Sequence, residues 1–303
     1  MLRGTLLYLA NQPGVREFVV SSALSRRIAR RFVAGEQLDE ALAAVRALNQ
    51  RGIAATLDHL GENVHDAREA CAATQDYLAI LQRINEAHLD STISVKLTAL
   101  GLDISADLAR ENLYRVLESA LACGSFVCVD MESSAYTERT IEIVLEMRRH
   151  FACVGTVLQA YLYRTRQDLE TLIAAGVRVR LVKGAYKEPK ELAFPAKADV
   201  DRNYCELMHR LLERGDYPAI ATHDERLINE ARRFTRARRI ARSRFEFQML
   251  YGIRRDLQER LVTEGYNMRV YVPYGSQWYP YLMRRMAERP ANLLFVAGNI
   301  LRR

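Results

Sequence analysis

Two adjacent arginines, Arg284 and Arg285, lie in the segment YVPYGSQWYPYLMRRMAERP, which spans residues 271–290. The segment ends a strand-like run, and the prolines that follow can open and close a short helix. On such a helix Glu288 lies four residues after Arg284 and three after Arg285, so one carboxylate can orient both guanidinium groups. Oriented guanidinium groups favour a small carboxylate or phosphate ligand, whereas the alternative is an ordinary solvated surface pair.

Polar side chains also gather where β-rich runs end, which is the usual place for chemistry in parallel-stranded folds. These residues are Glu62, Lys96, Asp130, Glu132, Gln159, Arg180, Lys183, Thr222, His223, Asp224, Gln248 and Tyr274. Their cations, together with the two arginines, predict a cavity for anions such as a substrate carboxylate and a phosphate-bearing cofactor. Lys96 or Lys183 could instead be a Schiff-base amine, because a buried lysine near other cations becomes nucleophilic. The alternative function is therefore a lyase of the aldolase type.

Eight β-rich runs must position these side chains. They begin at residues 54, 93, 126, 156, 177, 219, 244 and 268, and stretches of helical periodicity separate them. Eight such units predict an α/β fold, a (βα)8 barrel of the TIM type. Residues 1–52 read as extra N-terminal helices packing on a barrel formed by residues 53–303. A doubly wound sheet is the alternative, but no turn carries the GxGxxG pattern of a dinucleotide site.

Composition limits the choice of partners. The chain has 303 residues, a net charge of +7 and 49% hydrophobic residues, enough for one large barrel. Arginine clusters, such as the one across residues 232–244, favour anionic partners, which include nucleic acid and an anionic membrane surface; a merely soluble basic face is the alternative. No aromatic-and-basic pattern supports nucleic acid, so none is expected. Without a secretory signal or membrane-spanning stretch, the expected location is cytoplasmic.

Metal and triad chemistry have little support in the sequence. The five cysteines form no CxxC pair and look like small core residues in a reducing compartment. The segment DHLGENVHD holds a possible ligand cluster, but its spacing does not suit zinc, so we expect no metal. His223 and Asp224 lack a GxSxG elbow to supply a serine nucleophile.

In chain order, the motifs SVKLTALG, DMES, LQAYLYRT, RLVKGAY, ATHDE, FEFQMLYG and YVPYG…YLMRRMAERPAN resemble the strand-end motifs of the flavin-dependent proline dehydrogenase family, in its short monofunctional bacterial form. The resemblance covers about residues 54 to 295. It implies a distorted (βα)8 barrel that holds non-covalent FAD. It also implies oxidation of L-proline to Δ1-pyrroline-5-carboxylate by hydride transfer to FAD, with electrons passed to a membrane quinone, as the first step of proline catabolism.

The resemblance assigns roles by motif position. Lys96, Arg284 and Arg285 are implied to bind the proline carboxylate, and Glu288 to orient the arginines. The walls around the pyrrolidine ring are implied to be Tyr186, Leu250 and Tyr274. Arg180, near flavin N5, and Asp130, in the polar network beneath the substrate, are the implied catalytic residues. Contacts to FAD are implied for Met131, Gln159, Arg180, Lys183, Gly184, Ala185, Thr222 and His223. Glu62 matches a gate carboxylate able to pair with Arg284.

Two further expectations concern partners. The arginine-rich run 232–244 and the C-terminal NLLFVAGNILRR are candidates for contact with anionic lipid at the inner membrane surface, where quinone could be admitted. A solvated helix is the alternative. A non-enzymatic basic binding protein is a third interpretation, but it leaves RLVKGAY and YLMRRMAE unexplained.

Overall fold

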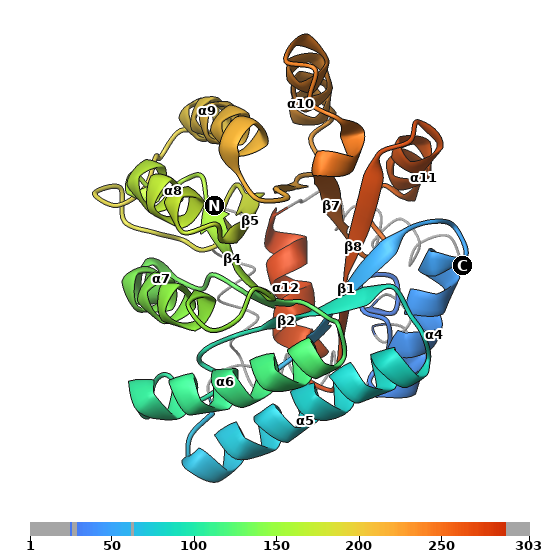
Figure 1. Cartoon of the computed structure of the whole chain (residues 1–303), viewed down its shortest axis with the longest axis vertical. Helices are drawn as coiled ribbons and strands as arrows, with labels where there is room; N and C mark the ends of the chain where they lie inside the picture. Colours follow the sequence, from blue (N-terminus) through green and yellow to red (C-terminus); the bar gives the residue numbers. More distant parts are fainter. Residues whose placement is uncertain (1–24, 26–28, 62–63, 289–303) are drawn as a thin grey trace.

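The computed structural model describes residue 25 and residues 29–61 and 64–288, with the backbone alone at 284 and 286–288. Eight parallel strands close into a barrel in chain order (Figure 1). The strands are β1 (Ala54–His59), β2 (Ser91–Val95), β3 (Val127–Val129), β4 (Val154–Gln159), β5 (Arg178–Val182), β6 (Ala219–Ala221), β7 (Glu246–Leu250) and β8 (Asn267–Tyr274). Closure comes from β1, which pairs with both β2 and β8. The predicted (βα)8 barrel is confirmed, and closure excludes the doubly wound alternative.

An outer ring of helices covers the barrel. It comprises α4 (Leu38–Asn49), α5 (Ala67–Glu86), α6 (Ala106–Ala122), α7 (Ser134–Arg148), α8 (Thr165–Ala174), α9 (Lys197–Arg214), α10 (Glu225–Ala237) and α11 (Arg255–Thr263). Local chemistry sets several helix starts: the side chains of Asp66, Ser105 and Asp224 each accept hydrogen bonds from backbone N–H groups of the following first turn. A short 3-10 turn, η1 (Arg242–Arg244), precedes β7.

The last helix departs from a regular barrel. Helix α4 packs against both β1 and β8 and so takes the place in the outer ring that a helix after β8 would fill. Helix α12 (Trp278–Glu288) instead packs with Leu60, after β1, and with Ile253, after β7. Both residues follow the carboxyl ends of their strands, so α12 lies across the barrel mouth, inside the ring of outer helices in Figure 1. This displacement brings the two arginines of α12 to the mouth.

The barrel interior is polar. Hydrogen bonds link strands that are not neighbours: Arg180 of β5 donates to Ser94 of β2, and Tyr271 of β8 donates to Asp130, directly after β3, so these side chains cross the interior. TIM barrels are usually filled by layers of Val, Ile and Leu. Here charged and amide side chains replace them, which requires partners within the barrel because buried polar groups are costly unless hydrogen-bonded.

Some details differ from expectation. Helix α12 begins at Trp278, two residues before the proline expected to open it, and α4 ends at Asn49, ahead of Gly52. Among the cysteines only Cys128 is buried, whereas Cys71 is exposed.

The division at residue 52 stays a prediction, since residues 1–24 lie outside the described part of the chain. None of the helices in the described residues is long and apolar enough to traverse a lipid bilayer.

Candidate active site at the barrel mouth

Lys96 is the centre of a buried ionic network. It follows β2, is 6% exposed, and its Nζ lies 2.8 Å from Asp58 Oδ1 and 3.7 Å from Asp130 Oδ2. Asp58 comes from β1 and is 1% exposed. The neighbours fix the ammonium group in position, and both are carboxylates. Two ion pairs hold the ammonium group in place, which does not favour the lyase interpretation for Lys96.

Asp130 connects Lys96 to Arg180. Its Oδ1 accepts from Arg180 Nη1 at 2.9 Å, and its Oδ2 accepts from the Tyr271 hydroxyl at 2.7 Å. Arg180 also donates to Ser94 Oγ at 3.1 Å and stacks over the Tyr271 ring at 5.3 Å. The structure therefore brings together Lys96, Asp130 and Arg180, three residues singled out from the sequence, in one network. It balances two carboxylates, Asp58 and Asp130, against two cations.

Burial sets the protonation behaviour of this network. Loss of solvent raises the pKa of Asp58, with the Lys96 ammonium opposing that shift and the Asp130 charge adding to it. Burial likewise raises the pKa of Tyr271 well above its usual range, reinforced by the Asp130 charge, so the phenol stays a hydrogen-bond donor. The carboxylate of Asp130 is thus held between a neutral donor and cations.

The predicted carboxylate clamp consists of Arg284 and Arg285, oriented by Glu288, and the structure describes the side chain of Arg285 alone among these three. Arg285 lies on α12 with its guanidinium 5.4 Å from the centroid of the Tyr281 ring, one turn earlier. The side chains of Arg284 and Glu288, and the whole of Glu62, lie outside the described residues, so their pairing stays a prediction.

The three residues expected to enclose the pyrrolidine ring differ in how far they are buried. Tyr274 ends β8, is 4% exposed and stacks on the His59 imidazole with ring centroids 5.1 Å apart. Leu250 ends β7 and is half-buried, and its backbone N–H donates to His223 Nε2 at 3.0 Å. Tyr186 lies in the segment after β5 and is partly exposed. Leu250 and Tyr274 end the neighbouring strands β7 and β8, and Tyr186 follows β5, with β6 in between, so an apolar ring could be enclosed at these strand ends.

Most residues expected to contact a cofactor lie at or after the carboxyl ends of β3, β4, β5 and β6. Met131, Gln159 and Thr222 are all buried and follow or end β3, β4 and β6. Gln159 donates to the backbone oxygen of Glu132, whose carboxylate accepts from the hydroxyl of Thr98. This bracing holds the first loops after β2, β3 and β4 together.

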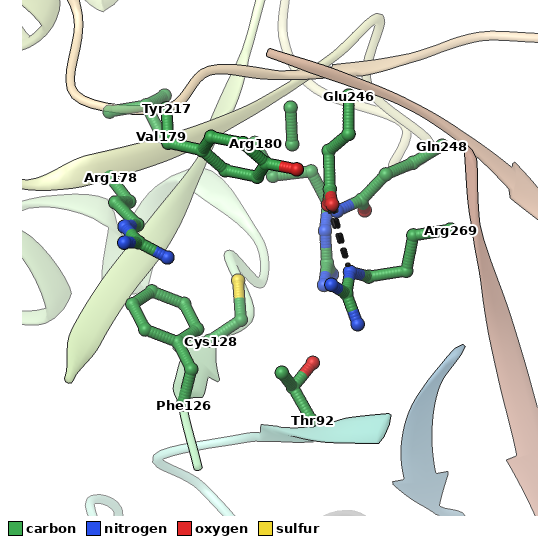
Figure 2. Close-up of a pocket in the computed structure, with 11 residues that line it drawn as sticks. Thr92, Phe126, Cys128, Arg178, Val179, Arg180, Tyr217, Glu246, Gln248 and Arg269 are labelled. Atoms are coloured by element: carbon green, nitrogen blue, oxygen red, sulfur yellow. Dashed lines mark hydrogen bonds and ion pairs between the residues drawn. The ribbon is translucent and has the colours of Figure 1, made fainter. Parts of the chain in front are cut away.

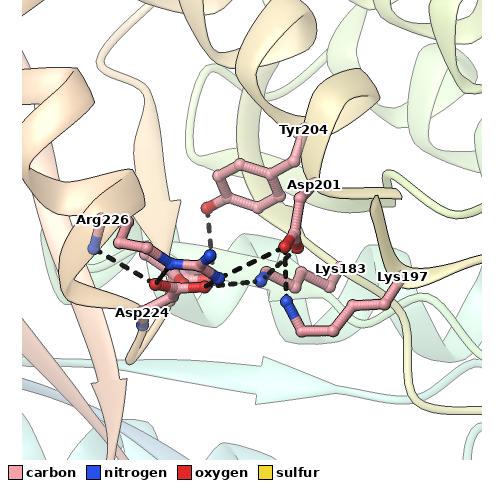
Figure 3. Close-up of polar contacts among 8 residues, drawn as sticks. Lys183, Lys197, Asp201, Tyr204, Asp224 and Arg226 are labelled. Carbon is pink, nitrogen blue, oxygen red and sulfur yellow. Dashed lines mark hydrogen bonds and ion pairs between the residues drawn. The ribbon is translucent and has the colours of Figure 1, made fainter. Parts of the chain in front are cut away.

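Lys183 belongs to a separate cluster, outside the Lys96 network (Figure 3). It contacts Asp201 of α9 and, at 3.1 Å, Asp224 at the start of α10. Lys197 also pairs with Asp201, and Arg226 pairs with both aspartates. Three cations against two carboxylates leave one excess positive charge at a partly exposed position, which suits a phosphate group. The ammonium of Lys183 is likewise held by two ion pairs, which does not favour Schiff-base chemistry there.

Asp224 should make the unfolding free energy depend on pH in the acid range. Hydrogen bonds from Arg226 and then from Lys183 hold its pKa well below the usual range, against the opposing effect of burial. Such a group stabilises the fold above about pH 4, and the contribution is lost as pH falls below that value. In urea unfolding between about pH 5 and pH 2, Asp224→Asn should therefore show a shallower loss of unfolding free energy than the wild type. Asparagine caps helices as well as aspartate does, so helix start is preserved. Parallel curves for the two proteins would contradict this assignment.

Gly184 brings the chain close to an aromatic ring. Its φ is +115°, and a Cβ placed there would lie 2.4 Å from Tyr161 Cδ1. Replacing Gly184 by alanine should therefore add both backbone strain and overlap, at a cost of about 2–4 kcal/mol in unfolding free energy. Gly124→Ala is the matched control, since Gly124 has φ +61° with nothing within 4 Å of a new Cβ, and should cost only about 1 kcal/mol. Equal costs in denaturant titrations would show that contact with Tyr161 does not restrict this position.

Several contributors were missed from the sequence. Asp58, Ser94 and Tyr271 complete the network, yet each lies within a strand run rather than at its end. The polar alternation along NMRVYVPYG was the available signal for Tyr271. The expectation for Gln248 was wrong: it faces a cavity at the amino ends of the strands, not the mouth, because it sits in the middle of β7.

The suspected metal motif is dispersed. Asp58 pairs with Lys96 inside the barrel, His59 Nδ1 lies 3.5 Å from Asp76, and Asp66 caps α5. In the described part of the chain, no three His, Cys, Asp or Glu side chains come together as a metal site would require.

Comparison with known proteins agrees with this geometry. Proline dehydrogenase 2 of Bacillus subtilis (strain 168) is 44% identical over 271 residues, covering 89% of both chains. Proline dehydrogenase of Deinococcus radiodurans is 41% identical over 307 residues, covering 100% of this chain and 98% of that one. Both are similar to this chain over nearly their full lengths.

Solved structures of a larger protein also match. Proline utilization A (PutA) of Bdellovibrio bacteriovorus, inactivated by N-propargylglycine, aligns with a TM-score of 0.82 at 28% identity over 87% of this chain. A PutA variant from Bradyrhizobium japonicum aligns with a TM-score of 0.76 at 25% identity. The chain spans about a third of the length of these PutA chains. The proline dehydrogenase family model matches residues 41–298, and the chain belongs to this family.

Proposed function

We propose that this chain oxidises L-proline to Δ1-pyrroline-5-carboxylate, with FAD as hydride acceptor and a quinone as the final acceptor. The observation that carries the proposal is the buried Asp58–Lys96–Asp130–Arg180 network at the mouth of a barrel of this family. The relatives are named proline dehydrogenase, which supports proline as the substrate. The charged residues at the mouth give a chemical reason for binding a small amino acid carboxylate.

Charge explains how a carboxylate substrate would bind. The buried network is balanced, so it offers no net attraction by itself. Helix α12 crosses the mouth and carries Arg284 and Arg285, two positive charges, and Glu288, one negative charge. The remaining single positive charge matches one substrate carboxylate. Lys96, held by Asp58, would donate to that carboxylate from below.

FAD fits the rest of the mouth. The excess positive charge at Lys183, Lys197 and Arg226 suits its diphosphate. Gln159, Thr222 and His223 offer polar groups at the carboxyl ends of β4 and β6. The cofactor, when bound, supplies a two-electron hydride acceptor.

The residues of the chain must then prepare proline for hydride loss. The ring nitrogen must be neutral, so that its lone pair can form the C=N bond as hydride leaves the adjacent ring carbon. Fixing the carboxylate sets the distance and angle of that carbon, and the walls of Tyr274 and Leu250 exclude water. Arg180, oriented by Asp130 and Ser94, presents a fixed positive charge where negative charge accumulates.

Peripheral contact with a membrane remains part of this proposal, but, contrary to the expectation from the sequence, the basic run does not lie next to the site. Helix α10 begins after the carboxyl end of β6 and ends before the amino end of β7, so residues 238–244 of the arginine-rich run 232–244 lie at the barrel end opposite the mouth. Contact of this run with anionic lipid would therefore not admit quinone to the site. The C-terminal NLLFVAGNILRR lies outside the described residues.

The visible spectrum of the purified protein tests the proposal. A flavin absorption band that bleaches when L-proline is added without oxygen would support cofactor, reaction and substrate together. A colourless protein that also fails to take up added FAD would overturn it. Borohydride trapping with a carbonyl compound checks the lyase alternative, because only a Schiff base becomes covalently fixed.

A further inference from the structure

A small cavity lies inside the barrel, and Arg180 forms part of its wall (Figure 2). Its volume is about 50 Å³, and its polar lining includes Thr92, Cys128, Arg180, Glu246, Gln248 and Arg269. Thr92, Glu246 and Arg269 lie in the first three residues of their strands, so the cavity is at the amino end of the barrel. None of these residues other than Arg180 has a role in the proposed reaction.

Two buried polar atoms in this lining have no hydrogen-bond partner among the described residues: Arg180 Nε and Gln248 Oε1. Arg180 is 7% exposed and Gln248 6%. The orientation of Gln248 is set by its neighbour, since Gln248 Nε2 donates to the Glu246 carboxylate, which leaves Oε1 as the unsatisfied acceptor. Glu246 is itself held by Arg269 Nε at 3.0 Å. One N–H donor and one oxygen acceptor thus line the same cavity.

The charges around the cavity favour a neutral occupant. The three cations of the wall are paired, Arg269 with Glu246, Arg180 with Asp130 and Arg178 with Asp216, so none of them is available for an anion. Burial raises the pKa of the Cys128 thiol to about 12, which keeps it neutral near pH 7. Water can accept from Arg180 Nε and donate to Gln248 Oε1, and 50 Å³ holds a few water molecules.

The cavity has a route to solvent. Its wall residues Thr92, Phe126 and Arg178 also line a larger depression of about 600 Å³, which reaches the ends of α5 and α6 at the same end of the barrel. Water exchange therefore does not require passage through the mouth where substrate would bind.

We propose that this cavity binds ordered water that accepts from Arg180 Nε and donates to Gln248 Oε1, and that Gln248 is thereby a positioning residue for Arg180. The water completes the bonding of the guanidinium, whose Nη atoms already donate to Asp130 and Ser94. Glu246 and Arg269 fix Gln248, so the support extends to the amino end of the barrel. The catalytic consequence rests on the proposed function, whereas the water site does not.

The water site is tested directly by a high-resolution crystal structure of the wild-type protein. Density for water within hydrogen-bonding distance of both Arg180 Nε and Gln248 Oε1 is the expected result. An empty cavity would overturn the proposal whatever the protein catalyses. This measurement also stands if the protein does not oxidise proline.

The positioning role is tested with Gln248→Met, which keeps the size of the side chain and removes its acceptor. We expect kcat for proline to fall about tenfold with KM within about twofold, because a displaced Arg180 costs transition-state stabilisation. The reduction potential of the bound flavin should become more negative, as a misplaced guanidinium stabilises reduced flavin less. Asn112→Leu is the matched control, because Asn112 is a buried amide of α6 that donates to the Leu100 carbonyl outside the barrel interior.

A second variant keeps the test decisive if Gln248→Met does not fold. Ala219→Val adds two methyl groups to the cavity wall, displacing water without removing any side-chain hydrogen bond. It should lower kcat and flavin potential in the same direction. If either folded cavity variant keeps the wild-type kcat and potential, or if Asn112→Leu changes them equally, Gln248 does not position Arg180.

Discussion

Replacing Arg285 by alanine should raise the Michaelis constant for proline by at least thirtyfold, with the flavin still bound. The physical reason is that a substrate carboxylate held between α12 and Lys96 would lose one guanidinium partner and remain partly unpaired in a desolvated site. Such losses cost about 2–5 kcal/mol in binding. Steady-state kinetics with proline, together with the flavin-to-protein absorbance ratio, measures both parts of the prediction.

Arg238→Ala provides a matched control for this result. Arg238 follows α10, and its guanidinium lies 5.6 Å from the Phe234 ring centroid, one turn earlier, against 5.4 Å for Arg285 over Tyr281. Because α10 ends before the amino end of β7, this substitution removes a similar cation–π contact at the barrel end opposite the mouth and should leave the Michaelis constant unchanged. An Arg285→Ala protein whose Michaelis constant matches that of the wild type would reject the carboxylate clamp.

The fold was accessible from sequence because each strand carries a strong local signal. All eight predicted β-rich runs correspond to strands, since barrel strands are covered on both faces and read as short apolar runs between helical periods. The position of α12 at the barrel mouth could not be predicted from the sequence. Its sequence predicts a helix, but only tertiary packing against Leu60 and Ile253 moves it from the outer ring to the mouth.

The site was predictable where polar residues end a strand, and not where they lie within one. Lys96 follows β2 and was found, whereas its buried partner Asp58 lies within the apolar run of β1. Whether such a residue points into the barrel depends on strand register, which a single sequence does not give. For the same reason Gln248 was placed at the wrong end: its distance from the mouth follows from the pairing of β7 with β6 and β8.

Lys96→Met should cost about 3–5 kcal/mol in unfolding free energy near neutral pH, because it removes the ammonium that faces two buried carboxylates. Its deficit should depend on pH in a defined direction. The pKa of Asp58 is already raised by burial and would rise further without Lys96. A group with a raised folded-state pKa stabilises the fold at pH values below its unfolded pKa, and that stabilisation is lost as pH rises through the folded value. The deficit should therefore be smallest near pH 4 and grow toward neutral pH.

Adding Asp58→Asn separates folding from substrate binding. The double variant no longer buries an uncompensated charge at residue 58, so it should recover most of the lost stability and lose most of the pH dependence. It should not recover the Michaelis constant, because neither a thioether nor an amide can replace the Lys96 ammonium at a carboxylate. Urea unfolding from pH 4 to pH 8 and proline kinetics on the wild type, both single variants and the double variant complete the cycle. Recovery of stability and of proline affinity together would show that Lys96 only balances Asp58. Recovery of stability alone would assign the ammonium to the substrate.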